Sequence, residues 1–164
     1  MSRGLLIDDK RSVKQAIAIV QRRYQTGQGL GVDVWDVARD LDGARKLLKA
    51  FQYQTILVDH DLGDPRTDGS HALAWLAGRW LDRAMLPLDR CHELPDYVYC
   101  VSSNPAALAK VNGWARDIAM LKKDYEEIAK DLEGRPEYVR SPETEEAIRQ
   151  VAERGARRDE EEKG

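Results

Sequence analysis

Short apolar runs alternate with helical patterns along most of the chain. Strand-like runs lie at 5–7, 32–37, 55–58 and 97–101, and a weaker fifth run lies at 118–121. Apolar residues at helical spacing predict helices near 13–24, 42–51, 70–84, from 105 onward and over 125–132, and Ser12 is placed to cap the first of them. This alternation predicts an α/β fold, a doubly wound parallel sheet of five strands with helices on both faces.

The pattern changes after residue 133. Gly134 and Pro136 break the last helix, one short helical stretch follows, and the chain ends in the charged run DEEEKG. We therefore expect a domain at 1–133 and a C-terminal extension at 134–164 that has one short helix and a disordered charged end. An extension of this length cannot hold a winged-helix DNA-binding domain.

Composition limits the function classes further. The net charge of −3 gives no general attraction to nucleic acid or to an anionic membrane. No apolar stretch approaches the roughly 20 residues that span a bilayer, and the start MSRGLLIDD enters a strand directly, so we expect a cytoplasmic protein. Cys91 and Cys100 lack motif spacing and are expected to be reduced.

Acidic residues follow two of the predicted strands. Asp8 and Asp9 end the first run, and Asp59 and Asp61 end the third. Because the carboxyl ends of parallel strands meet at one edge of a sheet, these carboxylates should lie close together and repel one another. A hard cation with oxygen ligands relieves that repulsion, so the pattern predicts a Mg²⁺ site held by Asp8, Asp9 and Asp59. The alternative is that the acids only cap the next helix.

The chain resembles the receiver domains of two-component response regulators over about residues 3–133. The matching segments are LLIDDKR at 5–11, TILVDHDLGDPRTDG at 55–69, YCVSSNP at 99–105 and AMLKKDY at 119–125. The resemblance implies a flavodoxin-like sheet, an acid pair that holds magnesium, and an aspartate after the third strand that accepts phosphoryl from a histidine kinase. Without an output domain, such a receiver would stand alone and act through contacts with a target protein or in a homodimer.

The same resemblance gives roles to hydroxyl and lysine side chains. Ser102 or Ser103 would donate a hydrogen bond to a phosphoryl oxygen, and Lys122 or Lys123 would add a cation. Phosphoryl transfer depends mainly on charge neutralisation and alignment, which these groups and the metal would supply. The proline that usually follows the lysine is missing, so the geometry after the fifth strand departs from the family pattern.

Two criteria place the acceptor differently. Counting back from the turn at Asp68 and Gly69 selects Asp61, whereas the hydrophobic register of the third strand selects Asp59. We favour Asp59, because its backbone should still belong to the sheet while Asp61 lies in a loop, where insertions and deletions gather.

The segments VDHDLG, SSNP and IDDKR also resemble a divergent group of cyclic-phosphate-processing receiver-like domains. This resemblance implies that the acidic pocket hydrolyses a phosphoester, with Asp61 as a supporting acid and His60 as a proton carrier or metal ligand. Alternation along the strand instead favours a solvent-facing loop position for His60.

Three functions therefore remain open from the sequence. The preferred one is a phospho-acceptor signalling module whose partner is a histidine kinase or a regulated target. The others are a pseudo-receiver that only binds another protein, such as a phage or host regulator, and a metal-dependent cyclic-phosphate or phosphoester hydrolase.

Overall fold

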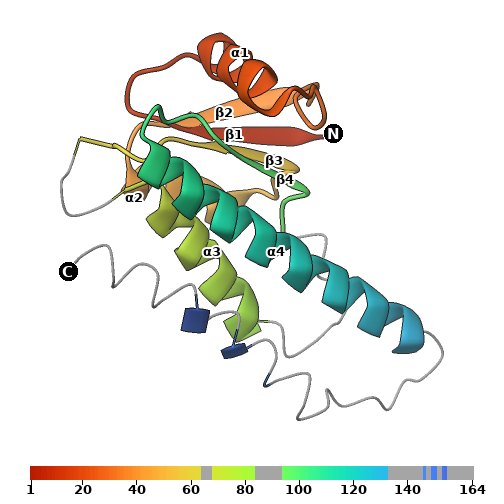
Figure 1. The fold of residues 1–164 in the computed structure, drawn as a ribbon. Coiled ribbons are helices and arrows are strands. Elements are labelled where there is room, and N and C mark those ends of the chain that lie inside the picture. Colours follow the sequence, from red (N-terminus) through yellow and green to blue (C-terminus); the bar gives the residue numbers. More distant parts are fainter. Residues whose placement is uncertain (64–67, 84–93, 133–145, 147–148, 151–152, 155–164) are drawn as a thin grey trace.

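Four parallel strands form one sheet in the part of the chain that the structure, a computed structural model, describes (Figure 1). That part excludes residues 64–67, 84–93, 133–145, 147–148, 151–152 and 155–164. The strands are β1 (Arg3–Ile7), β2 (Val34–Ala38), β3 (Thr55–Val58) and β4 (Tyr97–Cys100). Their order across the sheet is β2-β1-β3-β4, so the chain enters the sheet at β1 and builds outward on both sides.

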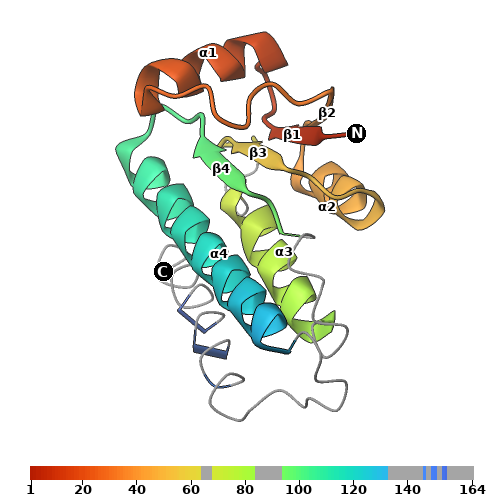
Figure 2. The ribbon, with the colours of Figure 1, turned by 90° about the vertical axis from the view of Figure 1, so that its right-hand side faces the viewer.

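Helices cover both faces of the sheet, as the alternating pattern predicts. They are α1 (Val13–Tyr24), α2 (Leu41–Ala50), α3 (Ser70–Arg83) and α4 (Pro105–Leu132). Among the helices that the structure describes, α1 alone covers one face, while α2, α3 and α4 lie on the other, with α3 and α4 side by side (Figures 1 and 2). The α/β class and the parallel sheet are therefore confirmed.

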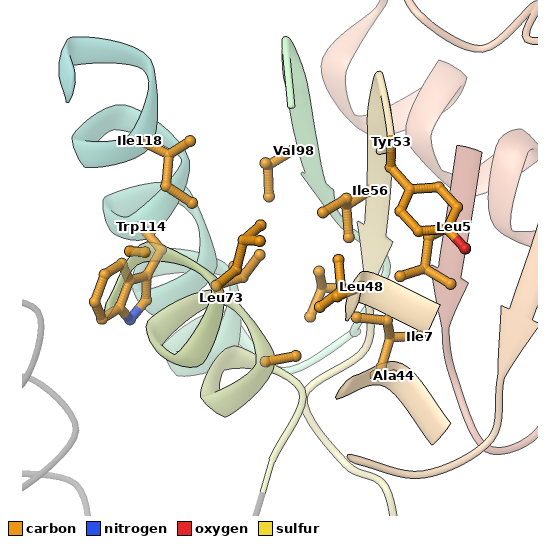
Figure 3. Packing of buried hydrophobic residues seen from close by; sticks show 14 of the residues in the cluster. Leu5, Ile7, Ala44, Leu48, Tyr53, Ile56, Leu73, Val98, Trp114 and Ile118 are labelled. Atoms are coloured by element: carbon orange, nitrogen blue, oxygen red, sulfur yellow. The ribbon is translucent and has the colours of Figure 1, made fainter. Parts of the chain in front are cut away.

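Alternation along the strands sends apolar side chains into two cores. Leu6 and Leu57 pack under α1, whereas Leu5, Ile7 and Ile56 face the three-helix side. Figure 3 shows the larger core, in which Leu73 of α3 and Ile118 of α4 face the sheet, while Trp114 lies farther from it, beside α3. Both faces of β1 and β3 are thus buried, which accounts for their uninterrupted apolar runs.

Side chains at the helix starts satisfy backbone donors. Ser12 accepts a hydrogen bond from the Gln15 amide at 3.2 Å, and the Gln15 side chain accepts one from the Ser12 amide at 2.9 Å. This capping box confirms the predicted role of Ser12. Asp40 caps α2 by accepting from the Gly43 amide at 2.7 Å.

The predicted fifth strand is wrong. Residues 118–121 lie inside α4, which runs without a break over the helix predicted at 125–132. The physical reason is a stripe of buried residues that recurs every three or four positions, the period of one helix: Val111, Trp114, Ile118, Leu121 and Tyr125. The sheet described here therefore ends at β4.

Side chains from α1 occupy the outer edge of β4. The Tyr24 hydroxyl accepts a hydrogen bond from the Cys100 amide at 3.0 Å and donates one to Asn112 Oδ1 of α4 at 2.6 Å. The Arg23 guanidinium donates to the Cys100 carbonyl at 2.8 Å. At Cys100, these contacts satisfy the backbone groups that a fifth strand would otherwise pair with.

The remaining expectations can be placed only in part. Most of the extension at 134–164 and Cys91 lie outside the described residues, while Cys100 is buried and free, as expected. Among the described helices, none combines the length and the apolar character that crossing a bilayer requires.

Candidate functional site

Three carboxylates meet at the carboxyl edge of the sheet, as the sequence predicts. Asp8 is fully buried, Asp59 is 6 % exposed, and Asp9 lies partly exposed beside them. Each of the three offers an oxygen within 4.8 Å of the others. The Asp8 amide donates to the Ala38 carbonyl at 3.0 Å and the Asp59 amide donates to the Ile7 carbonyl at 2.8 Å. The sheet ladder therefore fixes the backbone of both residues.

One guanidinium partly neutralises this cluster. Arg11 lies 3.0 Å from Asp8 Oδ2 and 3.4 Å from Asp59 Oδ2. Asp8 Oδ1 also accepts from the amides of Lys10 at 2.9 Å and Arg11 at 3.1 Å, so the turn after β1 wraps around the buried carboxylate. Arg39 donates to the Arg11 carbonyl at 2.7 Å and holds this turn from the other side.

The electrostatic balance at Asp59 still disfavours its charge. Burial first, and then the nearby charge of Asp8, raise the pKa of Asp59 to about 6, although Arg11 acts in the opposite direction. Burial opposes the charge of Arg11 as well, but its hydrogen bond and attraction to Asp8 outweigh that effect and raise its pKa. The three carboxylates therefore carry more negative charge than the single guanidinium of Arg11 neutralises.

This donor set fits a hard divalent cation. Carboxylate oxygens are the ligands that Mg²⁺ prefers. A cation bound at the cluster would neutralise the negative charge that Arg11 alone does not neutralise. Because Arg11 contacts both Asp8 and Asp59, a bound cation would compete with it for their oxygens.

The cluster borders an open cleft of about 520 Å³. Its lining residues are Asp9, Lys10, Arg11, Gln15, Asp59, His60, Asp61, Ser102, Ser103 and Asn104. Both serines line the cleft from the loop between β4 and α4. Ser102 is buried there, and Ser103 is exposed. The Ser102 hydroxyl accepts from the Asn104 amide at 3.2 Å, which leaves its proton available for a ligand.

Asp61 occupies a different position from Asp59. Its side chain is exposed in the loop after β3, where Oδ1 accepts from the Gly63 amide at 2.9 Å. An isolated antiparallel β-bridge pairs Asp61 with Asp68. Gly69 then packs so tightly on the Asp59 backbone that a Cβ atom there would lie 1.8 Å from the Asp59 carbonyl oxygen. Only glycine permits this approach.

The two predicted lysines are not brought to the cleft. Lys122 donates to the Leu94 carbonyl at 3.0 Å and forms an ion pair with Asp96. Both partners precede β4, so this contact lies at the amino edge of the parallel sheet, opposite to the carboxylates. Lys123 is exposed on α4. The expectation depended on a fifth strand that would have delivered a lysine to the carboxyl edge.

A buried lysine that the sequence analysis missed lies one turn into α4. The Lys110 side chain is 1 % exposed, and its Nζ lies 3.2 Å from Asp68 Oδ2. Burial alone would raise the pKa of Asp68, but the hydrogen bond from Ser70 and the charge of Lys110 outweigh burial and lower it. The available signal was spacing, since Lys110 falls on the buried stripe between Ala107 and Trp114.

His60 is less solvent-exposed than the alternation suggested. Its side chain is 27 % exposed, lines the cleft, and places Nε2 3.3 Å from Asp68 Oδ2. Asp68 in turn accepts hydrogen bonds from the Ser70 amide and hydroxyl. A buried and strongly held carboxylate therefore orients the imidazole at the wall of the cleft.

Comparison with known protein families gives a match over most of the chain. A family model described as "Cyclic-phosphate processing Receiver domain" matches residues 3–117, which include the whole sheet, the carboxylate cluster and the first part of α4. No curated protein and no solved structure matches the chain.

Proposed function

The chain belongs to the family of cyclic-phosphate processing receiver domains, and from that premise we propose that it is a metal-dependent phosphoesterase that opens cyclic phosphodiesters. The observation that carries this proposal is that the Asp8, Asp9 and Asp59 cluster borders a cleft whose lining includes Asp9, Asp59 and the imidazole of His60, which lies 3.3 Å from Asp68. A phosphoesterase needs a site for positive charge and a proton carrier close together.

In this proposal Asp8, Asp9 and Asp59 hold Mg²⁺. The bound ion would neutralise the phosphate oxygens as charge develops on them. The two aspartates at the strand ends need little reorganisation to serve as ligands, because the sheet ladder already fixes their backbones. Ser102, which lines the same cleft, would donate a hydrogen bond to a further phosphate oxygen.

His60 moves the proton that ring opening requires. A water oxygen bonds to phosphorus, the bond from phosphorus to one ribose oxygen breaks, and that oxygen takes up a proton as the product becomes a phosphomonoester. His60 gives this proton or accepts the one that the water loses, while Asp68 holds the ring in place and Lys110 holds Asp68. Asp61, at the rim, acts as a supporting acid.

The deciding experiment compares turnover with covalent labelling. With Mg²⁺ and a 2′,3′-cyclic nucleotide, the wild-type protein should release a nucleoside monophosphate, and its intact mass should stay unchanged. Asp59→Asn should abolish release, whereas Asp61→Asn should reduce it only partly, because Asp61 is exposed and lies in the loop. Absence of turnover under all metal conditions would contradict the proposal.

A second function, phosphoryl acceptance on Asp59, is favoured by one specific observation. Asp59 is nearly buried at a strand end with its amide in the sheet ladder, and Ser102 lies in the same cleft. In this case the protein would take phosphoryl from a histidine kinase and act through contacts with another protein. Incubation with a small phosphodonor should then add one phosphoryl mass, and peptide mapping should place it on Asp59 and not on Asp61.

If neither turnover nor labelling occurs, the third function, a pseudo-receiver that only binds a partner protein, gains support. Such a protein would keep the fold without using the carboxylates, so Asp59→Asn should then leave partner binding intact.

A further inference from the structure

A second, smaller cavity adjoins the acidic cleft on the side of α1. Its volume is about 220 Å³, and its lining residues are Arg11, Ile19, Arg22, Arg23, Val101 and Ser103. We refer to it as the arginine cavity. Arg11 and Ser103 line the acidic cleft as well, so the two hollows share a wall. Half of its lining residues are arginines, and none of those described is a carboxylate.

The arginines differ in how they are held. Arg23 is anchored, because one of its amino groups donates to the Cys100 carbonyl at 2.8 Å. Its guanidinium also contacts the Cys100 side chain. Because a guanidinium carries five donors, these two contacts still leave donors for a ligand. Arg22 is exposed and forms no ion pair with any residue in the described part of the chain. The cavity therefore combines two guanidinium groups that other residues hold, Arg11 at Asp8 and Asp59 and Arg23 at Cys100, with the exposed Arg22. The apolar residues Ile19 and Val101 complete its lining.

We propose that the arginine cavity binds a second phosphate group of the substrate, next to the phosphate that is processed in the acidic cleft. This inference rests on the proposed function, because the acidic cleft supplies the first phosphate position. Guanidinium groups match phosphate oxygens with paired hydrogen bonds, and the protein's net charge of −3 makes this concentration of positive charge a local feature. The second phosphate belongs either to the next internucleotide linkage of an oligonucleotide or to a second phosphate on a mononucleotide.

Direct binding tests this inference without relying on catalysis. The probe is a fluorescent short oligouridylate with a 3′-phosphate, titrated in Mg²⁺ and followed by fluorescence anisotropy. Arg22→Gln should weaken its binding by about tenfold or more, as expected for loss of one charge-assisted hydrogen-bond partner. The logarithm of the association constant falls linearly with the logarithm of the salt concentration, and in Arg22→Gln this slope should be less steep by about 0.7, the value for one phosphate contact on a single strand.

Arg45→Gln is the matched control. Arg45 is likewise an exposed helical arginine, but it lies on α2, on the opposite side of the sheet from α1. This control should bind the oligouridylate as the wild type does. Circular dichroism melts of both variants should match the wild type, since both side chains are exposed and neither forms an ion pair with a residue that the structure describes.

Competition by smaller ligands separates the two sources of the second phosphate. Uridine 3′-monophosphate carries one phosphate, and its affinity should be reduced less by Arg22→Gln than that of the oligouridylate. If uridine 3′,5′-bisphosphate loses as much affinity as the oligouridylate, a terminal phosphate is sufficient. If only the oligouridylate loses affinity, the cavity takes an internucleotide phosphate.

Equal losses for the one-phosphate ligand and the oligouridylate, or no loss for either, would overturn the inference. Failure of the proposed function has a different signature. In that case Arg22-dependent binding of the oligouridylate would persist, while no 2′,3′-cyclic phosphate would be turned over by the wild-type protein.

Discussion

At the scale of single residues, the charge of Asp59 is the most consequential. Its pKa is raised from an ordinary 3.8 to about 6, so the folded protein holds this proton more tightly than the unfolded chain does. The resulting loss of stability begins as the pH rises above the unfolded value and is fully present above the folded value. Without metal, stability should therefore fall between about pH 4 and pH 6.

Asp59→Asn removes this dependence. In buffer with a chelator, we expect the variant to melt at a higher temperature than the wild type near pH 7 and at the same temperature near pH 4. Asp61→Asn is the control, because Asp61 is exposed and should change neither melt. A lower melting temperature for Asp59→Asn near pH 7 would mean that the attraction between Asp59 and Arg11 outweighs burial and the repulsion from Asp8.

Lys110 leads to a prediction about buried charge. Lys110→Met leaves Asp68 without its buried cation, and the loss of one partner of a buried ion pair costs about 3–5 kcal/mol. Lys122→Met is the control in the same helix, since its partner Asp96 is 49 % exposed and a pair of this kind contributes only about 1 kcal/mol or less. Urea denaturation measures both changes. Equal losses would contradict the buried role of Lys110.

At the scale of helices and strands, the sequence predicts those features that depend on the periodicity of neighbouring residues. The period of α1 and its cap at Ser12 lie in consecutive residues, and the carboxylates converge because parallel strands end at one edge. The predicted fifth strand is wrong because Ile118 and Leu121 do not form a separate apolar run but continue the helical stripe from Val111 and Trp114.

The contacts of His60 could not be predicted in the same way. His60 contacts Asp68, which lies later in the same loop. Asp68 in turn contacts Lys110, which lies on α4 about forty residues after Asp68. No local sequence pattern predicts these contacts, because they arise from the packing of α4 against the sheet.

The contact between α1 and the edge of β4 gives a prediction for these elements. Tyr24→Phe removes the hydroxyl that bonds the Cys100 amide and Asn112, and it should cost about 1–3 kcal/mol, since a buried backbone donor loses its partner. Tyr97→Phe is the control, because no hydrogen bond of its hydroxyl occurs in the described structure. Hydrogen exchange should accelerate at the Cys100 amide in Tyr24→Phe only. Unchanged protection there would contradict this account of the β4 edge.

At the scale of the whole molecule, metal binding should stabilise the fold. A ligand that binds only the folded state adds about 2.7 kcal/mol at a hundredfold excess over its Kd. Millimolar Mg²⁺ should therefore raise the melting temperature of the wild type, and Asp9→Asn should abolish the rise because Asp9 completes the carboxylate cluster. Asp61→Asn should keep most of it. A wild-type protein that is indifferent to Mg²⁺ would favour the pseudo-receiver.

The length of α4 connects the cleft with a distant part of the molecule. Its 28 residues span about 42 Å at 1.5 Å per residue, and the helix continues well beyond the sheet (Figures 1 and 2). Its first turn follows the serines of the cleft, and Lys110 ties it to Asp68. Tyr125, near the far end, is still buried, and Lys122 donates to the Leu94 carbonyl, so α4 is packed over most of its length and couples the cleft rigidly to the amino edge of the sheet.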